Sequence, residues 1–416
     1  MIWPLPTDPD SAKQAAKGLK VAYAIFSAGF PTYLVGGCVR DSLLGIPNYD
    51  IDICTSAPPE IILELFPEAL PHGPQRYNIF RLPGDSGIIE IAHFRTERNC
   101  DGRHCEVELT GNLHLDLARR DFTVNALAVS PENREVIDEF GGIADLSSRL
   151  LRTVGEPSVR FAEDRLRILR GIRFAAKLNF KIDNDTRLAI EHEARNTNSL
   201  SGYRIRREIT SILQNGNSAK GISLLFELGI WPHIFEEIAD YPLSSSWQKR
   251  LAAIERVWKD GRGTELSWAV LLMPDLSCAN DEQREINGLV SKLGFPSSEG
   301  NRILTLCQLT NYAVQFHSLD LESKIAIADS HHLDDIEYLL SLLAPENDFK
   351  TTLRREFPSL GTPKLLAGKE LKAALSGIQG AEINSALKKL RYLELAGKIS
   401  SIGEAESFLR QWGRVS

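Results

Sequence analysis

Two aspartates, Asp50 and Asp52, are the residues whose types and spacing point most directly to chemistry. They stand in Tyr49-Asp50-Ile51-Asp52-Ile53, where polar and apolar residues alternate. This period of two predicts a β-strand and places both carboxylates on one face of a sheet. Carboxylate oxygens suit Mg²⁺, which fills its other positions with water and substrate phosphate. The pair therefore predicts phosphoryl or nucleotidyl transfer, against the alternative of a solvated strand edge.

A glycine turn precedes the two aspartates. Leu34-Val35 predicts a buried strand, Gly36-Gly37 a turn, and residues 39–44 a short helix that begins there. Glycine lets the backbone approach a ligand closely, and the first N–H groups of a helix are unpaired, so such a turn favours an anion. We expect phosphates and a metal ion to meet within one strand-turn-helix-strand unit.

Residues 34–55 resemble the first motif of the class II tRNA nucleotidyltransferase and bacterial poly(A) polymerase family, a branch of the polymerase-beta-like nucleotidyltransferases. Further segments resemble the family's later motifs in the same order, at residues 116–126, 140–155 and 160–176. The ordered match covers about the first half of the chain. It implies an α+β fold, in which a polymerase-beta-like nucleotidyltransferase α/β head is followed by an all-helical neck, body and tail.

The resemblance also implies a set of functional residues. Asp50 and Asp52 would be the catalytic residues and metal ligands of a two-metal reaction with Mg²⁺. Glu90, in the alternating segment 87–94, is a candidate third carboxylate, with a solvent-facing strand residue as the alternative. The residues expected to bind the nucleotide are Gly36, Gly37, Arg40, Arg119, Arg120, Asp121, Asn125, Asp164, Arg167 and Arg170.

Two groups of residues within this set are expected to select the nucleotide, one by its sugar and the other by its base. Arg120 and Asp121 offer a donor and an acceptor to a ribose 2′-hydroxyl, with a surface salt-bridge cluster as the alternative. Asp164 and Arg167, three residues apart on an expected helix, place a carboxylate beside a guanidinium. Cytosine and adenine each present an amino donor next to a ring-nitrogen acceptor, which complements that pair, whereas uracil and guanine present the reverse. The alternative is an ion pair that only braces the helix.

The predicted reaction is template-independent addition of CCA, or of the terminal A, to the 3′ end of tRNA from CTP and ATP, with release of pyrophosphate. The alternatives are poly(A) synthesis, a small-molecule nucleotidyltransferase, and a catalytically inactive RNA-binding member of the fold. The long segment 96–116 disfavours CC-only addition, because the resemblance implies a shorter loop in enzymes of that type. Tyr77-Asn78 stands where the family pattern leads us to expect Gly-Thr, so the resemblance does not predict the details of the pocket at these residues.

Strand signals nearly vanish after residue 149, and Leu166, Leu169, Ile172 and Ala176 follow helical spacing. RNA contacts are expected in the tail, at Lys369, Lys388 and Lys389. The predicted regions are a catalytic head at 19–148, a helical neck with the nucleotide-selecting helix at 149–215, a helical body at 216–345, and a helical RNA-binding tail at 346–416.

Composition restricts the class of protein further. The net charge of −7 requires that any contact with RNA phosphates use local basic patches. No apolar run approaches a membrane span, so we expect a cytoplasmic protein without a membrane partner. Six cysteines with no C-x-x-C pair favour reduced thiols, with oxidation of Cys100 and Cys105, which flank a polar loop, as the alternative. His331-His332 lacks spaced partner histidines, which argues against an HD-type metal site, and the sequence leaves the oligomeric state open.

Overall fold

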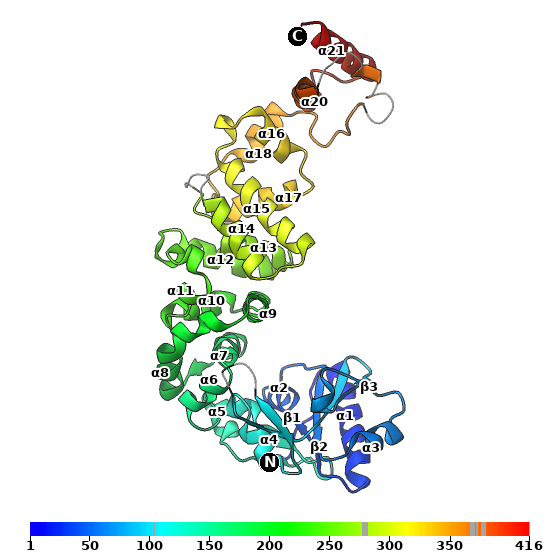
Figure 1. Ribbon diagram of the computed structural model, residues 1–416, viewed down its shortest axis with the longest axis vertical. Helices are drawn as coiled ribbons and strands as arrows, with labels where there is room; N and C mark the ends of the chain where they lie inside the picture. Colours follow the sequence, from blue (N-terminus) through cyan, green and yellow to red (C-terminus); the bar gives the residue numbers. More distant parts are fainter. Residues whose placement is uncertain are drawn as a thin grey trace. The chain divides into compact units, whose positions relative to one another are not determined.

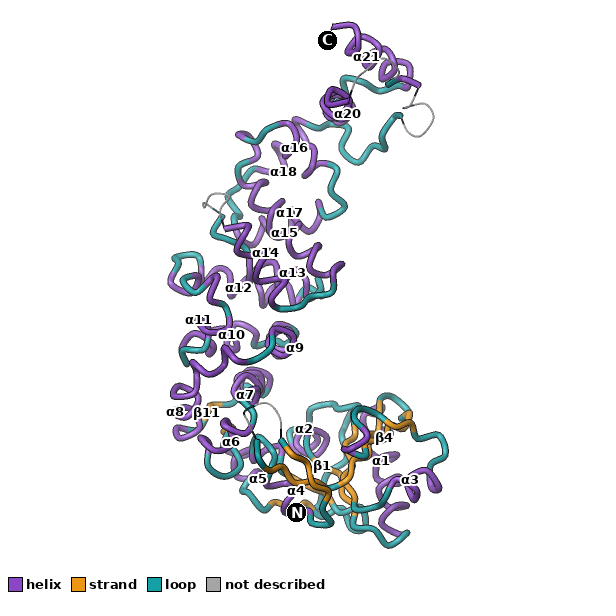
Figure 2. Tube along the Cα trace, viewed as in Figure 1, coloured by secondary structure: helices purple, strands orange, loops and turns teal. Residues whose placement is uncertain are grey.

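The computed structural model describes residues 1–100, 102, 105–276, 282–366, 371, 373–375 and 380–415. They belong to two compact units, Met1–Glu236 and Glu237–Ser416. Figures 1 and 2 show that the strands lie in the first unit, while the described part of the second is helix and loop. The predicted fold class, an α/β head followed by helices, is confirmed. The division into head, neck, body and tail remains a prediction.

Among the described residues, the head is built on a seven-stranded mixed sheet in the order β3-β4-β5-β2-β1-β8-β9. β2 and β5 run parallel, and the other neighbours are antiparallel. A separate antiparallel hairpin joins β6 and β7, and β10 pairs with β11. The strands are β1 (Thr32–Val35), β2 (Ile51–Thr55), β3 (Leu70–Pro71), β4 (Ile79–Pro83), β5 (Ile88–His93), β6 (Arg95–Arg98), β7 (Glu106–Leu109), β8 (Leu127–Val129), β9 (Val136–Asp138), β10 (Leu150–Leu151) and β11 (Lys181–Ile182).

The helices of the first unit are α1 (Pro9–Ser27), α2 (Gly37–Leu43), α3 (Pro59–Leu65), α4 (Leu113–Ala118), α5 (Gly142–Ser148), α6 (Pro157–Glu163), α7 (Leu166–Lys177), α8 (Asn184–Glu193), α9 (Gly202–Leu213), α10 (Ser218–Glu227) and α11 (Trp231–Ile234). They begin on this sheet, where α1 and α2 pack against β1 and β2, and continue away from it as α8 to α11 (Figure 1). Short 3₁₀ helices occur at Gln75–Tyr77, Thr123–Asn125, Ala194–Ser199, Glu236–Ile238, Tyr241–Leu243 and Phe316–Ser318.

Helix α1 packs against the central strands of the sheet. It packs on β1 and β2 and buries Ala15, Ala22 and Ile25. Gly18 lies directly over Ile51, and a Cβ at that glycine would come within 2.6 Å of the Ile51 side chain. The glycine therefore lets α1 lie close against β2 next to the Asp-x-Asp segment.

Helix α7 joins the sheet region to the helices that follow it. It packs against α9 and α10 and buries Ile168, Leu169 and Ile172, which confirms the helical spacing seen in the sequence. Phe122 and Phe174 meet edge to face at 5.9 Å, so the Arg-Arg-Asp segment and α7 share one apolar core. This packing fixes the polar residues of α7 relative to the sheet.

The described residues of the second unit form α12 (Trp247–Lys259), α13 (Thr264–Leu272), α14 (Glu282–Lys292), α15 (Ser297–Val314), α16 (Leu321–Ala328), α17 (Leu333–Leu343), α18 (Phe349–Glu356), α20 (Gly380–Leu395) and α21 (Ile402–Val415). Every residue of α13 from 266 to 272 is buried, which explains why this part of the helix is apolar except for Ser267. A smaller apolar cluster joins α20 to α21 and includes Ala386, Leu390, Ala405 and Leu409. In the described part of the chain, no helix is long and apolar enough to cross a bilayer.

Candidate active site

One cavity of about 650 Å³ gathers most of the predicted site residues. All ten residues predicted to bind the nucleotide line it, from Gly36 and Gly37 in the head to Arg170 in α7. Asp52 and Glu90 line it as well. Residues from sequence positions 36 to 170 therefore meet in one place, although their roles in binding remain predictions.

The carboxylates are arranged by strand register. Asp52 in β2 lies directly opposite Glu90 in β5, so both side chains leave the same face of the sheet. Glu90 accepts a hydrogen bond of 3.1 Å from Nε of Arg81 on β4. Asp50 stands one residue before β2, is exposed, and donates its backbone N–H to Oδ1 of Asn48 at 2.9 Å. Asp50 is not among the residues that line the cavity.

The donor set around Asp52 suits a hard cation. Burial raises the pKa of Asp52 to about 6, and the negative charges of Glu90 and Asp50 add to this rise while Arg120 opposes it. A group of carboxylate oxygens with excess negative charge matches the ligands that Mg²⁺ prefers, together with water and phosphate. Among the described residues, no three His, Cys, Asp or Glu side chains form a group that could hold a metal ion by themselves. Metal binding here would therefore need oxygens from water or substrate.

The glycine turn brings the backbone against the site. Gly36 has φ of +75°, a region that favours glycine, and it caps the N-terminus of α2. A Cβ at Gly36 would lie 2.9 Å from Nη1 of Arg120 and 3.6 Å from Oδ2 of Asp52. A side chain at this position would therefore occupy the space between these two charged groups.

Arg119 and Arg120, the two arginines of the second motif at residues 116–126, both contact the buried carboxylate of Asp116. Nη2 of Arg119 and Nη2 of Arg120 contact opposite oxygens of Asp116 at 2.7 and 3.0 Å. Burial opposes ionisation of Asp116, but the two guanidinium groups outweigh it and lower the pKa to about 2. For Arg120, burial likewise opposes the charge, and Asp116 raises the pKa above its usual value. Both arginines are thus fixed as cations in the cavity wall.

Asp121 lies in a second buried network. Arg170 contacts its Oδ2 at 2.6 Å, while Nδ2 of Asn125 and the N–H of Phe122 donate to Oδ1 at 3.0 and 2.9 Å. Burial opposes ionisation of Asp121, yet Arg170 and these donors lower its pKa to about 2. Arg40 donates to Oδ1 of Asn125, so α2, the 3₁₀ turn and α7 are connected.

Asp164 and Arg167 do not lie on one helix as expected. Asp164 has extended backbone angles and ends α6, and its Oδ1 accepts the N–H of Leu166 at the start of α7. Each forms its ion pairs with other residues. Asp164 pairs with Arg204, whereas Arg167 is buried and pairs with Glu97 at 3.1 Å and with Glu163. Both nevertheless line the cavity.

Several residues of the site were not predicted from the sequence. Arg95, Arg173 and Lys177 line the cavity, and the latter two follow Arg170 at helical spacing on α7, a signal that the sequence does contain. Tyr77, at the departure from the family pattern, lies with its ring 4.8 Å from the guanidinium of Arg95. Arg204 could not be found from the sequence, because it reaches Asp164 across 40 positions.

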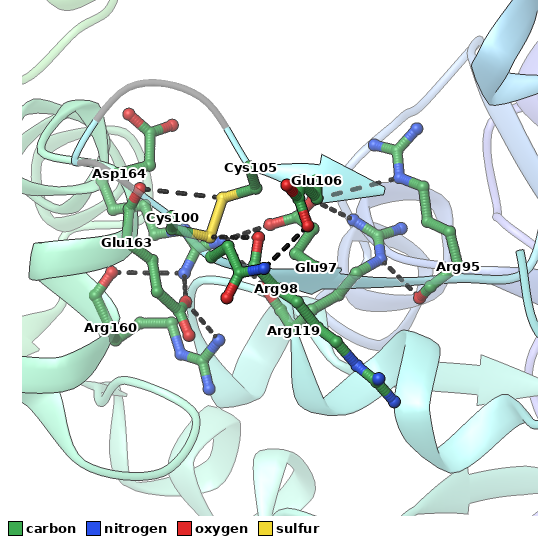
Figure 3. Close-up of a disulfide and its surroundings, with 12 residues drawn as sticks. Arg95, Glu97, Arg98, Cys100, Cys105, Glu106, Arg119, Arg160, Glu163 and Asp164 are labelled. Carbon is green, nitrogen blue, oxygen red and sulfur yellow. Dashed lines mark hydrogen bonds and ion pairs between the residues drawn. A yellow bond between two sulfur atoms is a disulfide. The ribbon is translucent and has the colours of Figure 1, made fainter. Parts of the chain in front are cut away.

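The cysteines differ from the expectation of reduced thiols. Cys100 and Cys105 form a disulfide at the tip of the β6–β7 hairpin (Figure 3), while Cys38, Cys54 and Cys307 are buried free thiols. The sequence left oxidation of this pair open, because the two cysteines flank a polar loop but match no motif. The hairpin brings their Cα atoms to 4.1 Å.

The predicted RNA-binding lysines lie in the second unit. Lys388 on α20 forms an ion pair with Glu322, and Nζ of Lys389 lies 5.2 Å from the ring of Tyr392. Lys369 lies outside the described residues. Contact of these residues with RNA remains a prediction.

Comparison with known families gives two matches. Residues 32–152 match the family described as Poly A polymerase head domain. Residues 179–241 match the family described as probable RNA and SrmB-binding site of polymerase A. The residues that line the cavity therefore come from the head-domain match, from Asp164 and from α7.

Curated relatives include the CCA-adding enzymes of Latilactobacillus sakei, 37% identical over 56% of this chain, and of Streptococcus thermophilus, 38% identical over 62%. The matched segments span 58% and 63% of those two proteins. The crystal structure of Bacillus stearothermophilus CCA-adding enzyme in complex with CTP is similar at a TM-score of 0.73, with 26% identity over 98% of this chain and 99% of that one. Thermotoga maritima CCA-adding enzyme complexed with tRNA shares the fold, with a TM-score of 0.65, 21% identity, and coverage of 97% and 96% of the two chains.

Proposed function

We propose, from the premise that the chain belongs to the class II tRNA nucleotidyltransferase and poly(A) polymerase family, that it adds CCA or the terminal A to the 3′ end of tRNA from CTP and ATP. The observation that carries this proposal is the cavity in which Asp52 lies with Asp164, Arg167 and the arginines of the second motif. One cavity thus contains groups suited to a metal, a triphosphate and a base. We propose that the protein works in the cytoplasm.

Asp50 and Asp52 would hold a divalent metal ion, the cofactor of this family, and we propose Mg²⁺. A divalent ion held there would supply stabilisation of charge on the reacting phosphate and would favour deprotonation of the attacking 3′-hydroxyl. Glu90 is the candidate third ligand, and it would have to release or share its hydrogen bond with Arg81.

The cationic wall supports triphosphate binding. Arg119 and Arg120 are held in place by Asp116, and α7 adds Arg170 and Arg173 along the same cavity. Guanidinium groups form short, charge-assisted hydrogen bonds with phosphate oxygens, often two at a time. Because these arginines are already fixed by the protein, little side-chain order has to be gained when the nucleotide binds.

Base selection would use Asp164 and Arg167. The Asp164 carboxylate accepts from Arg204 and Leu166, yet a carboxylate has about four lone-pair sites, so acceptor capacity remains for an exocyclic amine. The two Nη groups of Arg167 donate to Glu97, Glu163 and the carbonyl oxygens of Arg119 and Arg160. A base would therefore accept from its Nε–H or replace one of these acceptors. This arrangement supports acceptance of CTP and ATP and rejection of UTP and GTP.

The test is extension of three tRNAs that end before the first C, after CC, and after CCA, with Mg²⁺ and each labelled nucleotide in turn. CCA addition predicts C, C and A on the first tRNA, A on the second, and no extension of the third. Terminal-A addition predicts extension of the second alone, whereas repeated A on all three indicates a poly(A) polymerase. No incorporation with any tRNA would reject the proposed activity.

A further inference from the structure

The β6–β7 hairpin carries a covalent cross-link at its tip. Cys100 follows β6, Cys105 precedes β7, and the disulfide joins them across the end of the hairpin (Figure 3). Below it, Nδ2 of Asn99 donates to Oε2 of Glu106 at 2.7 Å, and Arg98 pairs with Glu108 at 3.4 Å. The cross-link therefore closes a short, otherwise polar hairpin.

The cross-linked tip touches the connection between α6 and α7. Sγ of Cys105 lies 3.9 Å from the carbonyl oxygen of Glu163. Gly102 forms a backbone bridge with Asp164, and its carbonyl oxygen accepts the N–H of Arg165 at 3.2 Å. A Cβ at Gly102 would lie 3.0 Å from Cζ of Arg165, so the two segments are in close contact.

Strand β6 of the same hairpin contacts Arg167, which with Asp164 is proposed to select the base; we call these two the base-reading residues. Oε2 of Glu97 in β6 accepts from Nη2 of Arg167 at 3.1 Å, and Oε1 of Glu97 contacts Arg119 at 3.3 Å. One hairpin thus holds the backbone at Asp164 through its tip and the side chain of Arg167 through its strand. A change in the order of the tip would act on both residues.

We propose that Cys100 and Cys105 form a reversible redox site that tunes the choice of incoming nucleotide. The proposal rests on the proposed function, because it assigns a consequence to the same base-reading residues. Both half-cystines are half-buried, so a small thiol or disulfide reagent has access to them. In a reducing compartment, disulfides in ordinary proteins are commonly transient and redox-sensing.

The chemistry is thiol–disulfide exchange with a low-molecular-weight disulfide. One cysteine thiolate attacks a sulfur of the reagent, forming a mixed disulfide and releasing one thiol. The second cysteine thiolate attacks the mixed disulfide, so the Cys100–Cys105 bond forms and the second reagent thiol leaves. Two protons and two electrons leave the cysteines, and the reagent disulfide is reduced to two thiols.

Reduction removes the cross-link and increases the conformational freedom of the tip, which weakens its contacts with Asp164 and Arg165. We expect the oxidised protein to prefer CTP and ATP over UTP and GTP more strongly than the reduced protein does. The contact that is weakened is about one hydrogen bond, between Gly102 and Arg165. The preference for CTP and ATP should therefore differ by about fivefold between the oxidised and the reduced protein.

The experiment equilibrates the full chain with oxidised and reduced glutathione at several ratios and measures the oxidation of Cys100 and Cys105 by alkylation and mass spectrometry. Binding of each of the four nucleotides is then measured for the oxidised and reduced forms. The control is Cys100→Ser/Cys105→Ser, which retains the other four cysteines, Cys38, Cys54, Cys278 and Cys307, and should show no change in nucleotide preference with glutathione.

Reversible oxidation together with a change in binding preference that is lost in the double variant supports the proposal. Equal preferences in both forms, or a pair that does not exchange with glutathione in the folded protein, would overturn it. The measurement is nucleotide binding, so it tests the redox site even if the protein does not extend tRNA. Failure of tRNA extension in both the oxidised and the reduced form would reject the proposed function alone.

Discussion

Arg204 on α9 holds Asp164 in place, with Nη2 lying 2.8 Å from one carboxylate oxygen and 2.9 Å from the other. The contact joins the start of α9 to the connection between α6 and α7. Asp164 therefore has a fixed orientation before any base is bound. In our account Arg204 is a positioning residue, because it acts through Asp164 without contacting the nucleotide.

Replacing Arg204 by Ala should reduce nucleotide selectivity because the Asp164 carboxylate loses its orientation. We expect the preference for CTP and ATP over UTP and GTP to fall by about five- to tenfold, with KM for CTP rising more than kcat falls. Arg204→Lys should restore part of the preference. Arg187→Ala, which removes an exposed pair with Glu191, is the matched control. An unchanged preference in Arg204→Ala would show that the ion pair serves the fold alone.

Replacing Asp164 by Ala removes the proposed acceptor for the exocyclic amine that cytosine and adenine share. A charge-assisted hydrogen bond contributes about 1.5–3 kcal/mol, so the preference for CTP and ATP should drop by about one to two powers of ten. The measurement is incorporation of all four nucleotides into one tRNA by wild type and variant. Loss of stability with the same order and ratio of nucleotides would contradict a role in base choice.

Gly36→Ala should impair activity beyond its cost in backbone strain. The new Cβ would lie 2.9 Å from Nη1 of Arg120, so the arginine must move. Gly45→Ala is the matched control, since Gly45 has a similar φ of +69° but a Cβ added there would meet no atom within 4 Å outside its chain neighbours. Both variants should lose about 1 kcal/mol of stability from the left-handed backbone. A steady-state assay should show a lower kcat in Gly36→Ala alone, and equal kcat values would refute a steric role for this glycine.

The Asp121–Arg170 pair predicts a pH dependence of stability. The pKa of Asp121 is lowered from 3.8 to about 2, so ionised Asp121 favours the folded state. Its contribution is fully present above about pH 4 and is lost as pH falls toward 2; its magnitude is about 2 kcal/mol. Urea unfolding of wild type and Asp121→Asn should show a constant difference in unfolding free energy from pH 7 to 5 and a smaller one below pH 4. A difference that grows on acidification would contradict the assigned direction.

The sequence predicted the parts of the site that depend on local pattern. The period-two segment around Asp52, the glycine turn at Gly36 and the helical stripe of α7 all follow from side-chain spacing. The same kind of pattern led us to place Asp164 and Arg167 on one helix, which was wrong. A separation of three residues fits a continuous helix, but it fits equally well a helix that ends at Asp164. A pattern of this kind does not distinguish a helix interior from a helix end that is capped by the next residue.

Contacts between distant segments were not accessible from the sequence. The pairing of Asp164 with Arg204 and that of Arg167 with Glu97 both depend on tertiary structure. A charged residue has many partners available in a chain with 48 basic and 55 acidic residues, so spacing alone could not identify the right one. The network that orients the base-reading residues became visible only in the folded chain.

The most direct test of the account is extension of a tRNA that ends after CC by wild type and by Asp52→Asn. Wild type should add A to this tRNA, and only when a divalent ion is present. Asp52→Asn should lose about three powers of ten in rate while binding tRNA normally, because a metal ion contributes several kcal/mol of charge stabilisation. Asp85→Asn, an exposed carboxylate paired with Lys17, is the control and should retain full activity. If Asp52→Asn extends the tRNA at a rate close to that of wild type, the central claim that this carboxylate binds the catalytic metal is wrong.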